Sequence, residues 1–232
     1  MKIMLRSLVL CTGLLTLLVC NKLSASGFQV SPIRFEYSAQ QRVQELRISN
    51  RSEQPLVVQV ELMQWQQIDG QEKLSPTRDL LASPPIVEVA ARQKRAIRIG
   101  RRSLEQTACE SSYRVIVTEI PARHAKTQEP VKFRSRMRLP LFIENGEDCR
   151  AHLQAQRQGQ AIVLRNSGNA HTQLQDALVI GPHGQWPLSL PQVGYVLANS
   201  MLLVELPDQA QTHTALQLHY RQGRDTLHLP IQ

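Results

Sequence analysis

The chain has 232 residues and a formal net charge of +8, with 27 Lys and Arg against 19 Asp and Glu. A basic balance is compatible with nucleic-acid binding, but four Phe, four Tyr and two Trp supply few aromatic platforms for stacking bases. The composition therefore argues against a nucleic-acid partner.

The first 26 residues have the organisation of a secretory signal peptide. Lys2 and Arg6 form a basic start, residues 8–19 are mostly apolar, and residues 24–26 are small residues suited to cleavage. The apolar run is short for a membrane span, and no later segment is apolar enough for membrane insertion. We therefore expect a soluble protein that is exported from the cytoplasm.

Short runs of alternating polar and apolar residues follow, separated by turn residues, and no stretch has the pattern of a long amphipathic helix. This pattern predicts an all-β chain whose antiparallel sheets form sandwiches. The predicted strands are residues 28–37, 43–49, 56–66, 86–89, 96–99, 113–119, 130–143, 161–165, 174–180, 194–197, 201–206, 215–220 and 226–230. Turns are predicted at residues 69–70, 167–168, 183–184 and 222–223.

The strand at residues 130–143, read PVKFRSRMRLPLFI, has one apolar face and one basic face. The apolar face carries Val131, Phe133, Met137 and Leu139, interrupted by Ser135, while Lys132, Arg134, Arg136 and Arg138 lie on the other face. Two interpretations fit this pattern. The strand is either a sheet edge whose cations discourage aggregation or a strand that completes the sheet of another protein.

Two cysteines remain after removal of the signal peptide, Cys109 and Cys149. In an oxidising compartment an even pair allows one disulfide bond. The bond would close a loop of about forty residues and contribute about 3–4 kcal/mol to stability. Because the pair has no CxxC spacing, its expected role is structural.

The length and a weak internal repeat indicate two domains. Removing 26 residues from 232 leaves about 206, enough for two domains of about 100 residues each. Residues 46–60 and 162–179 share the order strand, Asn-led polar turn, strand, which fits two immunoglobulin-like domains. We place the boundary at the polar cluster 145–148, so that residues 1–26, 27–144 and 145–232 are signal peptide, N-terminal domain and C-terminal domain.

Four segments carry a resemblance to a known family. They are VSPIRFEY at residues 30–37, ASPPIVEV at 82–89, SSYRVIVTEIP at 111–121 and the basic strand. In this order they resemble the periplasmic chaperones of the chaperone–usher pathway, which assembles bacterial pili. The combination of SYR, TEIP and RLPLF resembles the archaic branch of that family. The resemblance covers residues 28–142; beyond them, only strand spacing and the LRNSGNAH turn agree.

This resemblance implies a fold, a location and partners. It implies two immunoglobulin-like β-sandwich domains set at an angle with a cleft between them, in a periplasmic protein. The implied partners are pilin subunits, each lacking a final strand, and an outer-membrane usher that receives them. The basic strand would fill the subunit groove by donor-strand complementation, a form of β-augmentation. The resemblance leaves open whether the free chain also associates with itself through this strand.

The resemblance also implies roles for single residues. Arg34 and Arg138 fall where two cleft cations bind the C-terminal carboxylate of the subunit, and an arginine fork suits a carboxylate. Arg114 is a further candidate for this anchor. Glu119 resembles a glutamate at the domain interface, although no basic partner for it follows the basic strand. For Arg34 and Arg138 the alternative is a solvated surface position, and for the apolar donor residues, including Leu139, it is packing inside their own domain.

Other functional classes have little support. The sequence contains no GxSxG, P-loop, GxGxxG or HExxH motif, and its seven histidines are scattered without a metal-ligand spacing. We therefore expect neither an enzyme nor a protein with a metal or cofactor. The alternative function is a secreted adhesive or carbohydrate-binding module with the same fold. Such a module needs exposed aromatic residues in loops, yet Trp65 and Trp186 are isolated in the sequence.

Overall fold

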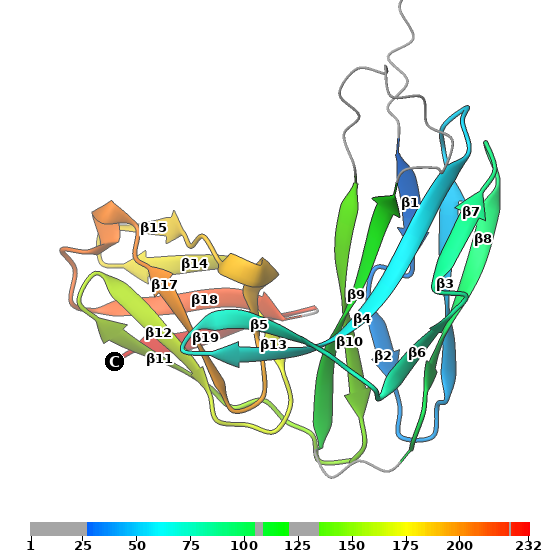
Figure 1. Ribbon diagram of the computed structural model, residues 1–232. Helices are drawn as coiled ribbons and strands as arrows, with labels where there is room; N and C mark the ends of the chain where they lie inside the picture. Colours follow the sequence, from blue (N-terminus) through cyan, green and yellow to red (C-terminus); the bar gives the residue numbers. More distant parts are fainter. Residues whose placement is uncertain (1–26, 105–108, 121–134, 223) are drawn as a thin grey trace, which may run out of the picture.

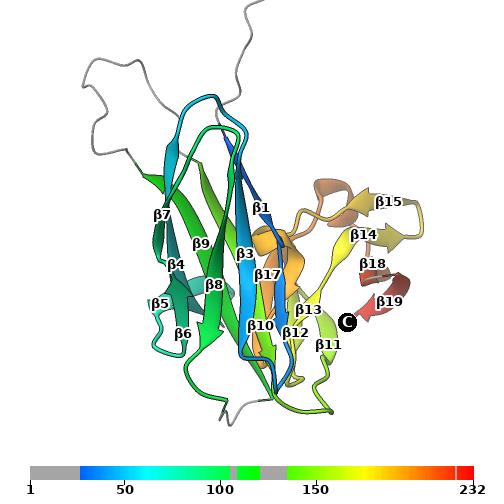
Figure 2. The same cartoon turned by 90° about the vertical axis from the view of Figure 1, so that its right-hand side faces the viewer.

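The computed structural model describes residues 27–104, 109–120, 135–222 and 224–232. The predicted signal peptide, Val131 and Phe133 lie outside these residues. Within them the regular secondary structure is almost entirely β-strand, which confirms the predicted class, and the strands form two sandwiches (Figures 1 and 2). No helix in the described part of the chain is long and apolar enough to cross a membrane.

The first sandwich consists of two sheets packed face to face. One sheet has four strands, in the order β1 (Phe28–Ser31), β3 (Val43–Asn50), β8 (Lys94–Arg101) and β6 (Leu80–Ser83). The other sheet has six strands. Five follow the order β2 (Phe35–Tyr37), β10 (Arg136–Glu144), β9 (Glu110–Ile120), β4 (Leu56–Ile68) and β5 (Gln71–Pro76), and the sixth, β7 (Ile86–Val89), also pairs with β4. All these pairs are antiparallel except β2 with β10.

The second sandwich is formed by a sheet of seven strands and a short two-stranded sheet. The larger sheet has the order β15 (Gly184–Pro187), β14 (Gln175–Gly181), β18 (Leu216–Gln222), β19 (Asp225–Ile231), β11 (Leu153–Gln158), β12 (Ala161–Asn166) and β17 (Ser200–Glu205). The smaller sheet pairs β13 (Thr172–Gln173) with β16 (Tyr195–Val196). Two short 3₁₀ helices, Pro191–Gly194 and Asp208–Ala210, complete this half of the chain. We propose residue 145 as the boundary between the N-terminal and C-terminal domains.

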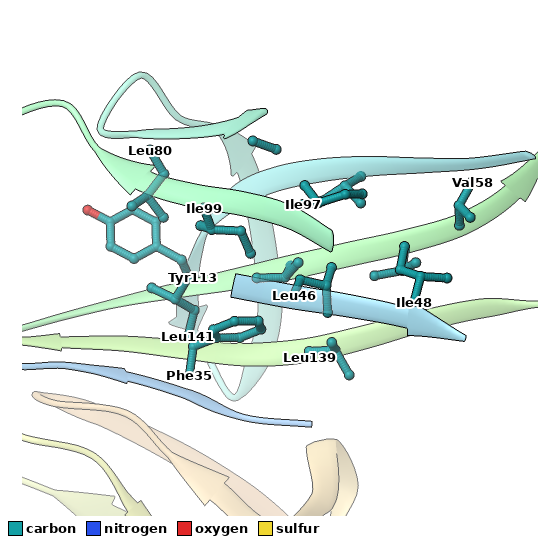
Figure 3. Packing of buried hydrophobic residues seen from close by; sticks show 14 of the residues in the cluster. Phe35, Leu46, Ile48, Val58, Leu80, Ile97, Ile99, Tyr113, Leu139 and Leu141 are labelled. Atoms are coloured by element: carbon teal, nitrogen blue, oxygen red, sulfur yellow. The ribbon is translucent and has the colours of Figure 1, made fainter. Parts of the chain in front are cut away.

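Each sandwich encloses its own apolar core. Alternation along the strands sends every second side chain inward, and in the first sandwich Phe35, Leu46, Ile97, Leu139 and Leu141 meet between the two sheets (Figure 3). A separate cluster that includes Ile162, Leu164, Val179 and Leu218 fills the second sandwich. The strands of the second sandwich run across the direction of those in the first, so the two halves lie at an angle (Figure 1).

The predicted first strand, residues 28–37, is in fact two strands. β1 belongs to the four-stranded sheet and β2 to the other, and the chain crosses between them at Pro32, Ile33 and Arg34. Proline has no backbone N–H to donate and a fixed φ, which favours a break in pairing at this point. The crossing places Arg34 immediately before the strand that pairs with β10.

The predicted turn at residues 69–70 is confirmed and joins β4 to β5. Asp69 and Gly70 both have positive φ, 51° and 75°, as a tight type I′ hairpin requires. The sequence did not predict β5, because residues 71–76 lack clear alternation. The tip of this hairpin reaches the second sandwich, where a side chain added at Gly70 would come within 3.4 Å of the Leu203 backbone nitrogen.

The disulfide bond between Cys109 and Cys149 is formed, with 5.6 Å between the two Cα atoms. It joins the residue before β9 to the segment that follows β10. The backbone N–H of Asn145 also donates to the Cys109 carbonyl, at 2.8 Å. This crosslink therefore fastens the connection between the two sandwiches to the end of the first one.

Candidate functional site between the two sandwiches

One face of β10 is buried and the other is turned toward the second sandwich. The side chains of Leu139, Leu141 and Ile143 lie in the first core, and Met137 packs against it. Leu139 is only 7% exposed (Figure 3). This burial favours, of the two interpretations of Leu139, packing inside its own domain, because the domain's own core already covers it.

The backbone of β10 has an open edge. β9 pairs with the whole strand, but β2 pairs only with Leu141, Phe142 and Ile143. Within the described residues, positions 136–140 therefore have β9 on one side and no strand on the other. Ser135, half-buried at the start of this edge, accepts the Glu119 backbone N–H through its carbonyl at 3.0 Å. An open edge of this kind is able to pair with an added strand.

Arg34 lies where the open edge ends, since Phe35 is paired with Leu141. Its guanidinium is 5.3 Å from the centre of the Phe142 ring and 5.8 Å from that of the Tyr195 ring. It donates to the Tyr195 hydroxyl at 3.4 Å and forms an ion pair with Glu36 at 2.5 Å. The side chain is still 34% exposed, so it remains accessible to a ligand.

Two pockets adjoin Arg34. One, of about 360 Å³, is lined by Arg34, Glu36, His171, Thr172, Gln173, Gln175 and Gln222. The other, of about 540 Å³, lies toward the connection between the sandwiches and includes Arg34, Glu110 and Glu144. Polar side chains predominate in both, which suits a charged chain end better than an apolar small molecule.

Arg114 and Arg138 hold the same carboxylate. Arg114 Nε donates to one oxygen of Glu72 at 3.0 Å, and Arg138 Nη1 donates to the other at 3.2 Å. The Arg114 guanidinium also stacks on Trp65, 3.4 Å from the ring centre. Burial lowers the pKa of Arg114, and the charge of Glu72 opposes that shift. The Arg114 side chain is buried beneath Glu72, whereas Arg138 remains half-exposed.

A small apolar cluster, separate from the two cores, joins the two sandwiches. It contains Trp65 and Phe142 from the first and Tyr195 and Leu197 from the second. Next to it the side-chain amide of Gln67 donates to the Tyr195 carbonyl at 2.7 Å and accepts the Leu197 N–H at 2.9 Å. Tyr195 lies 5.8 and 5.9 Å from the guanidinium carbons of Arg34 and Arg114. The interface therefore brings the three predicted arginines near one another.

Glu110 forms the polar contact across the interface that the sequence predicts for Glu119. Glu110 accepts both the backbone N–H and a ring nitrogen of His171 in the second sandwich. Glu119 lies nine residues further along β9, about 30 Å away. It also lies on the core side of the sheet by alternation with Val115 and Val117. The prediction of an interface role for Glu119 is therefore wrong.

The sequence analysis missed Glu72, Glu110, His171 and Tyr195. Two weak signals were present: Glu72 follows the predicted Asp69-Gly70 turn, and His171 is the last residue of the LRNSGNAH segment. Neither indicates an arginine partner, because the partners of Glu72 are 42 and 66 residues away. Only the folded chain brings them together.

Comparison with known proteins agrees with this architecture. The family model of the pili and flagellar-assembly chaperones, PapD N-terminal domain, matches residues 27–144. No curated protein matches the chain.

Three solved structures share the fold over most of the chain. The CsuC–CsuE chaperone–tip adhesion subunit complex from archaic Csu pili of Acinetobacter baumannii matches with TM-score 0.67 and 22% identity, covering 89% of this chain and 98% of that one. The Salmonella enterica SafA pilin complex with the SafB chaperone matches with TM-score 0.66 and 15% identity, covering 89% of this chain and 97% of that one. The Pseudomonas aeruginosa CupB2 chaperone matches with TM-score 0.63 and 18% identity, covering 88% of this chain and 100% of that one. The chain belongs to the family of pili and flagellar-assembly chaperones with the PapD N-terminal domain.

Proposed function

We propose that this pilus chaperone binds pilin subunits in the periplasm by donor-strand complementation and delivers them to an outer-membrane usher. The observation that carries the proposal is the open edge of β10, which ends at Arg34. A subunit strand pairing with this edge gains main-chain hydrogen bonds that do not depend on its sequence. Family membership and the likeness to two chaperone complexes, one with a pilin and one with a tip adhesion subunit, support the same role.

The donor side chains in this proposal are Val131 and Phe133, with Ser135 beside them. They continue the alternation of Met137 and Leu139, which the first core already contacts. Burying each large apolar side chain in a subunit groove contributes about 1.5–3 kcal/mol. The strand thus has two parts, one that completes its own domain and one that completes the subunit.

Arg34 is the proposed principal anchor for the C-terminal carboxylate of the subunit. For that carboxylate to reach Arg34, the subunit strand must end at the cleft and therefore run parallel to β10. Each charge-assisted hydrogen bond contributes about 1.5–3 kcal/mol, and fixing the chain end also fixes the register. Arg138 is the second anchor because it is half-exposed. Arg114 supports it from beneath through the shared Glu72.

The finer assignments in this proposal rest on sequence and on one structural comparison. The SYR and TEIP segments and the match to the archaic CsuC chaperone support the archaic branch. The basic start and apolar run of residues 1–26 support export by a signal peptide. Self-association of the free chain would use the same open edge as the subunit and would therefore compete with it.

The test is co-expression with a candidate pilin. Arg34→Ala combined with Arg138→Ala is expected to abolish recovery of soluble pilin while the chaperone itself stays folded, because both side chains are partly exposed. Arg95→Ala, which removes an exposed cation of the other sheet, is the matched control and should leave recovery unchanged. Wild-type recovery with the double variant would refute the anchor. A pilin that gains nothing from the unmodified chaperone would favour the adhesive or carbohydrate-binding alternative.

A further inference from the structure

We propose that Glu110 and His171 are positioning residues for Arg34: together they hold its guanidinium toward the cleft by fixing which ring nitrogen of His171 carries the proton. The inference rests on the proposed anchoring role of Arg34. It assigns a purpose to a buried carboxylate and a buried imidazole for which the packing of the two sandwiches alone gives no reason.

The three side chains form a line across the domain interface. Glu110 Oε2 is 2.6 Å from His171 Nδ1, and His171 Nε2 is 3.0 Å from Arg34 Nη2. The Glu110 side chain is 0% exposed and that of His171 is 9% exposed. The second oxygen of Glu110 accepts the His171 backbone N–H at 3.0 Å. Arg34 and Glu110 belong to the first sandwich and His171 to the second.

The chemistry of the neighbours determines the tautomer. An arginine guanidinium only donates hydrogen bonds and keeps its charge in proteins, so His171 Nε2 must accept from Arg34. An ionised carboxylate only accepts, so Nδ1 must carry the proton. The neutral imidazole with Nδ1–H satisfies both requirements. A ring protonated on both nitrogens would direct an N–H at Arg34 and lose that bond.

Packing holds the ring in the plane that this arrangement needs. His171 stacks on Phe142 with ring centres 3.5 Å apart and planes 6° apart. Tyr195 lies at 5.7 Å on another side. The charged or titratable groups around His171 are Glu110, Arg34 with its partner Glu36, and Tyr195. A tilt of the ring out of this plane would break the stack as well as both hydrogen bonds.

One consequence links the anchor to the arrangement of the two halves. Arg34 reaches its orientation only when the second sandwich brings His171 against Phe142 and Glu110. A change in the angle between the sandwiches would therefore release the anchor without touching the open edge of β10. This gives the second sandwich a part in subunit binding beyond supporting the first.

Glu110→Gln is the sharpest test because it preserves shape. To keep accepting the His171 backbone N–H, the amide introduced by this substitution must turn its NH₂ group toward Nδ1. That donor favours the other tautomer, whose Nε2–H then faces a guanidinium that cannot accept, much as an Asp-to-Asn change misorients a catalytic histidine. His171→Gln should substitute in part, since its amide oxygen can accept from Arg34. Glu88→Gln, which changes an exposed carboxylate of β7 outside both pockets, is the matched control.

Two measurements on the full-length protein test the inference: one of the His171 tautomer and one of carboxylate binding. The ¹⁵N chemical shifts of the His171 ring report its tautomer. Titration with N-acetylalanine, followed at the backbone amide signals of Gln173 and Gln175 in the pocket beside Arg34, reports carboxylate binding, with N-acetylalaninamide as the uncharged control. We expect Nδ1–H in the unmodified protein and Nε2–H in Glu110→Gln, with affinity reduced about tenfold. His171→Gln should stay within about threefold of the unmodified protein.

Three results would overturn the inference: an Nε2–H tautomer in the unmodified chain, an unchanged tautomer in Glu110→Gln, or a changed tautomer with unchanged affinity. If Glu110→Gln does not fold, His171→Gln and His171→Phe decide the question, because only the phenylalanine variant should lose binding. Failure of the anchor is separable from failure of this inference. If Arg34→Ala binds the carboxylate normally, Arg34 is not the anchor, whereas the tautomer still reports on Glu110.

Discussion

Arg114 is a charged side chain enclosed by the contact between the two sandwiches. Its guanidinium lies between the Trp65 ring and the Glu72 carboxylate, and burial lowers its pKa. A buried cation is tolerated only when a partner and hydrogen bonds compensate for the lost water. Glu72 supplies both, and because its second oxygen binds Arg138, it couples a buried arginine to a half-exposed one.

Glu72→Gln is therefore expected to destabilise the protein. The variant keeps the shape of the side chain but removes the charge that compensates Arg114 and turns one of the two accepting oxygens into a donor, for an expected loss of about 1–3 kcal/mol in the free energy of unfolding. Urea unfolding of the purified chain measures this change. Glu53→Gln, which removes an exposed ion pair with Arg92, is the control and should cause no measurable loss. Equal stability of both variants would mean that Glu72 does not compensate a buried charge.

At the scale of one element, β10 serves two purposes along its length. From Met137 onward its apolar face packs against the domain's own core, and the backbone edge opposite β9 is closed by β2 only from Leu141. The same strand can therefore stabilise the first sandwich through its side chains and offer its backbone edge to an added strand.

Substitutions on the two faces of the basic strand, residues 130–143, are expected to affect pilin recovery differently. Phe133→Glu should sharply reduce the recovery of soluble pilin, because a carboxylate in an apolar groove is costly to bury. Lys132→Glu, one residue away on the other face, should have a much smaller effect. Pull-down of pilin from periplasmic extracts with each tagged chaperone variant measures the difference. Equal losses would show that the face offered to the subunit is wrongly assigned.

At the scale of the whole molecule, the contact between the sandwiches is small but chemically specific. Trp65, Phe142, Tyr195 and Leu197 exclude water, and Gln67 ties its strand to the backbone of the second sandwich through two hydrogen bonds. The disulfide between Cys109 and Cys149 shortens the connection on the same side of the molecule. Together these contacts keep the cleft residues at a defined separation.

Gln67→Ala is expected to loosen this arrangement without unfolding either half. Two hydrogen bonds of about 1 kcal/mol each are lost, so the two sandwiches should sample a wider range of angles. Small-angle X-ray scattering should then show a broader distance distribution than for the unmodified protein. Gln66→Ala, on the exposed side of the same strand, serves as control. An unchanged scattering profile for Gln67→Ala would assign the interface to the apolar cluster alone.

Much of this protein could be predicted from its sequence because the relevant information is local. Alternation along short segments predicts strands, and it indicated both the all-β class and the two-faced strand ending in Leu139 and Leu141. An even pair of cysteines in a chain expected to be exported allowed the disulfide. The segments around Arg34 and Arg114 are recognisable because each is a continuous stretch.

The tertiary structure alone decided which side chains meet. Alternation could not show that Leu139 is covered by its own core, nor that residues 28–37 divide between two sheets. Glu72 reaches Arg138 across 66 residues, and His171 reaches Glu110 across 61. The physical reason is that such contacts depend on how two separately folded sandwiches are oriented. That orientation is determined by a few side chains at the interface between the sandwiches, which are distant from one another in the sequence.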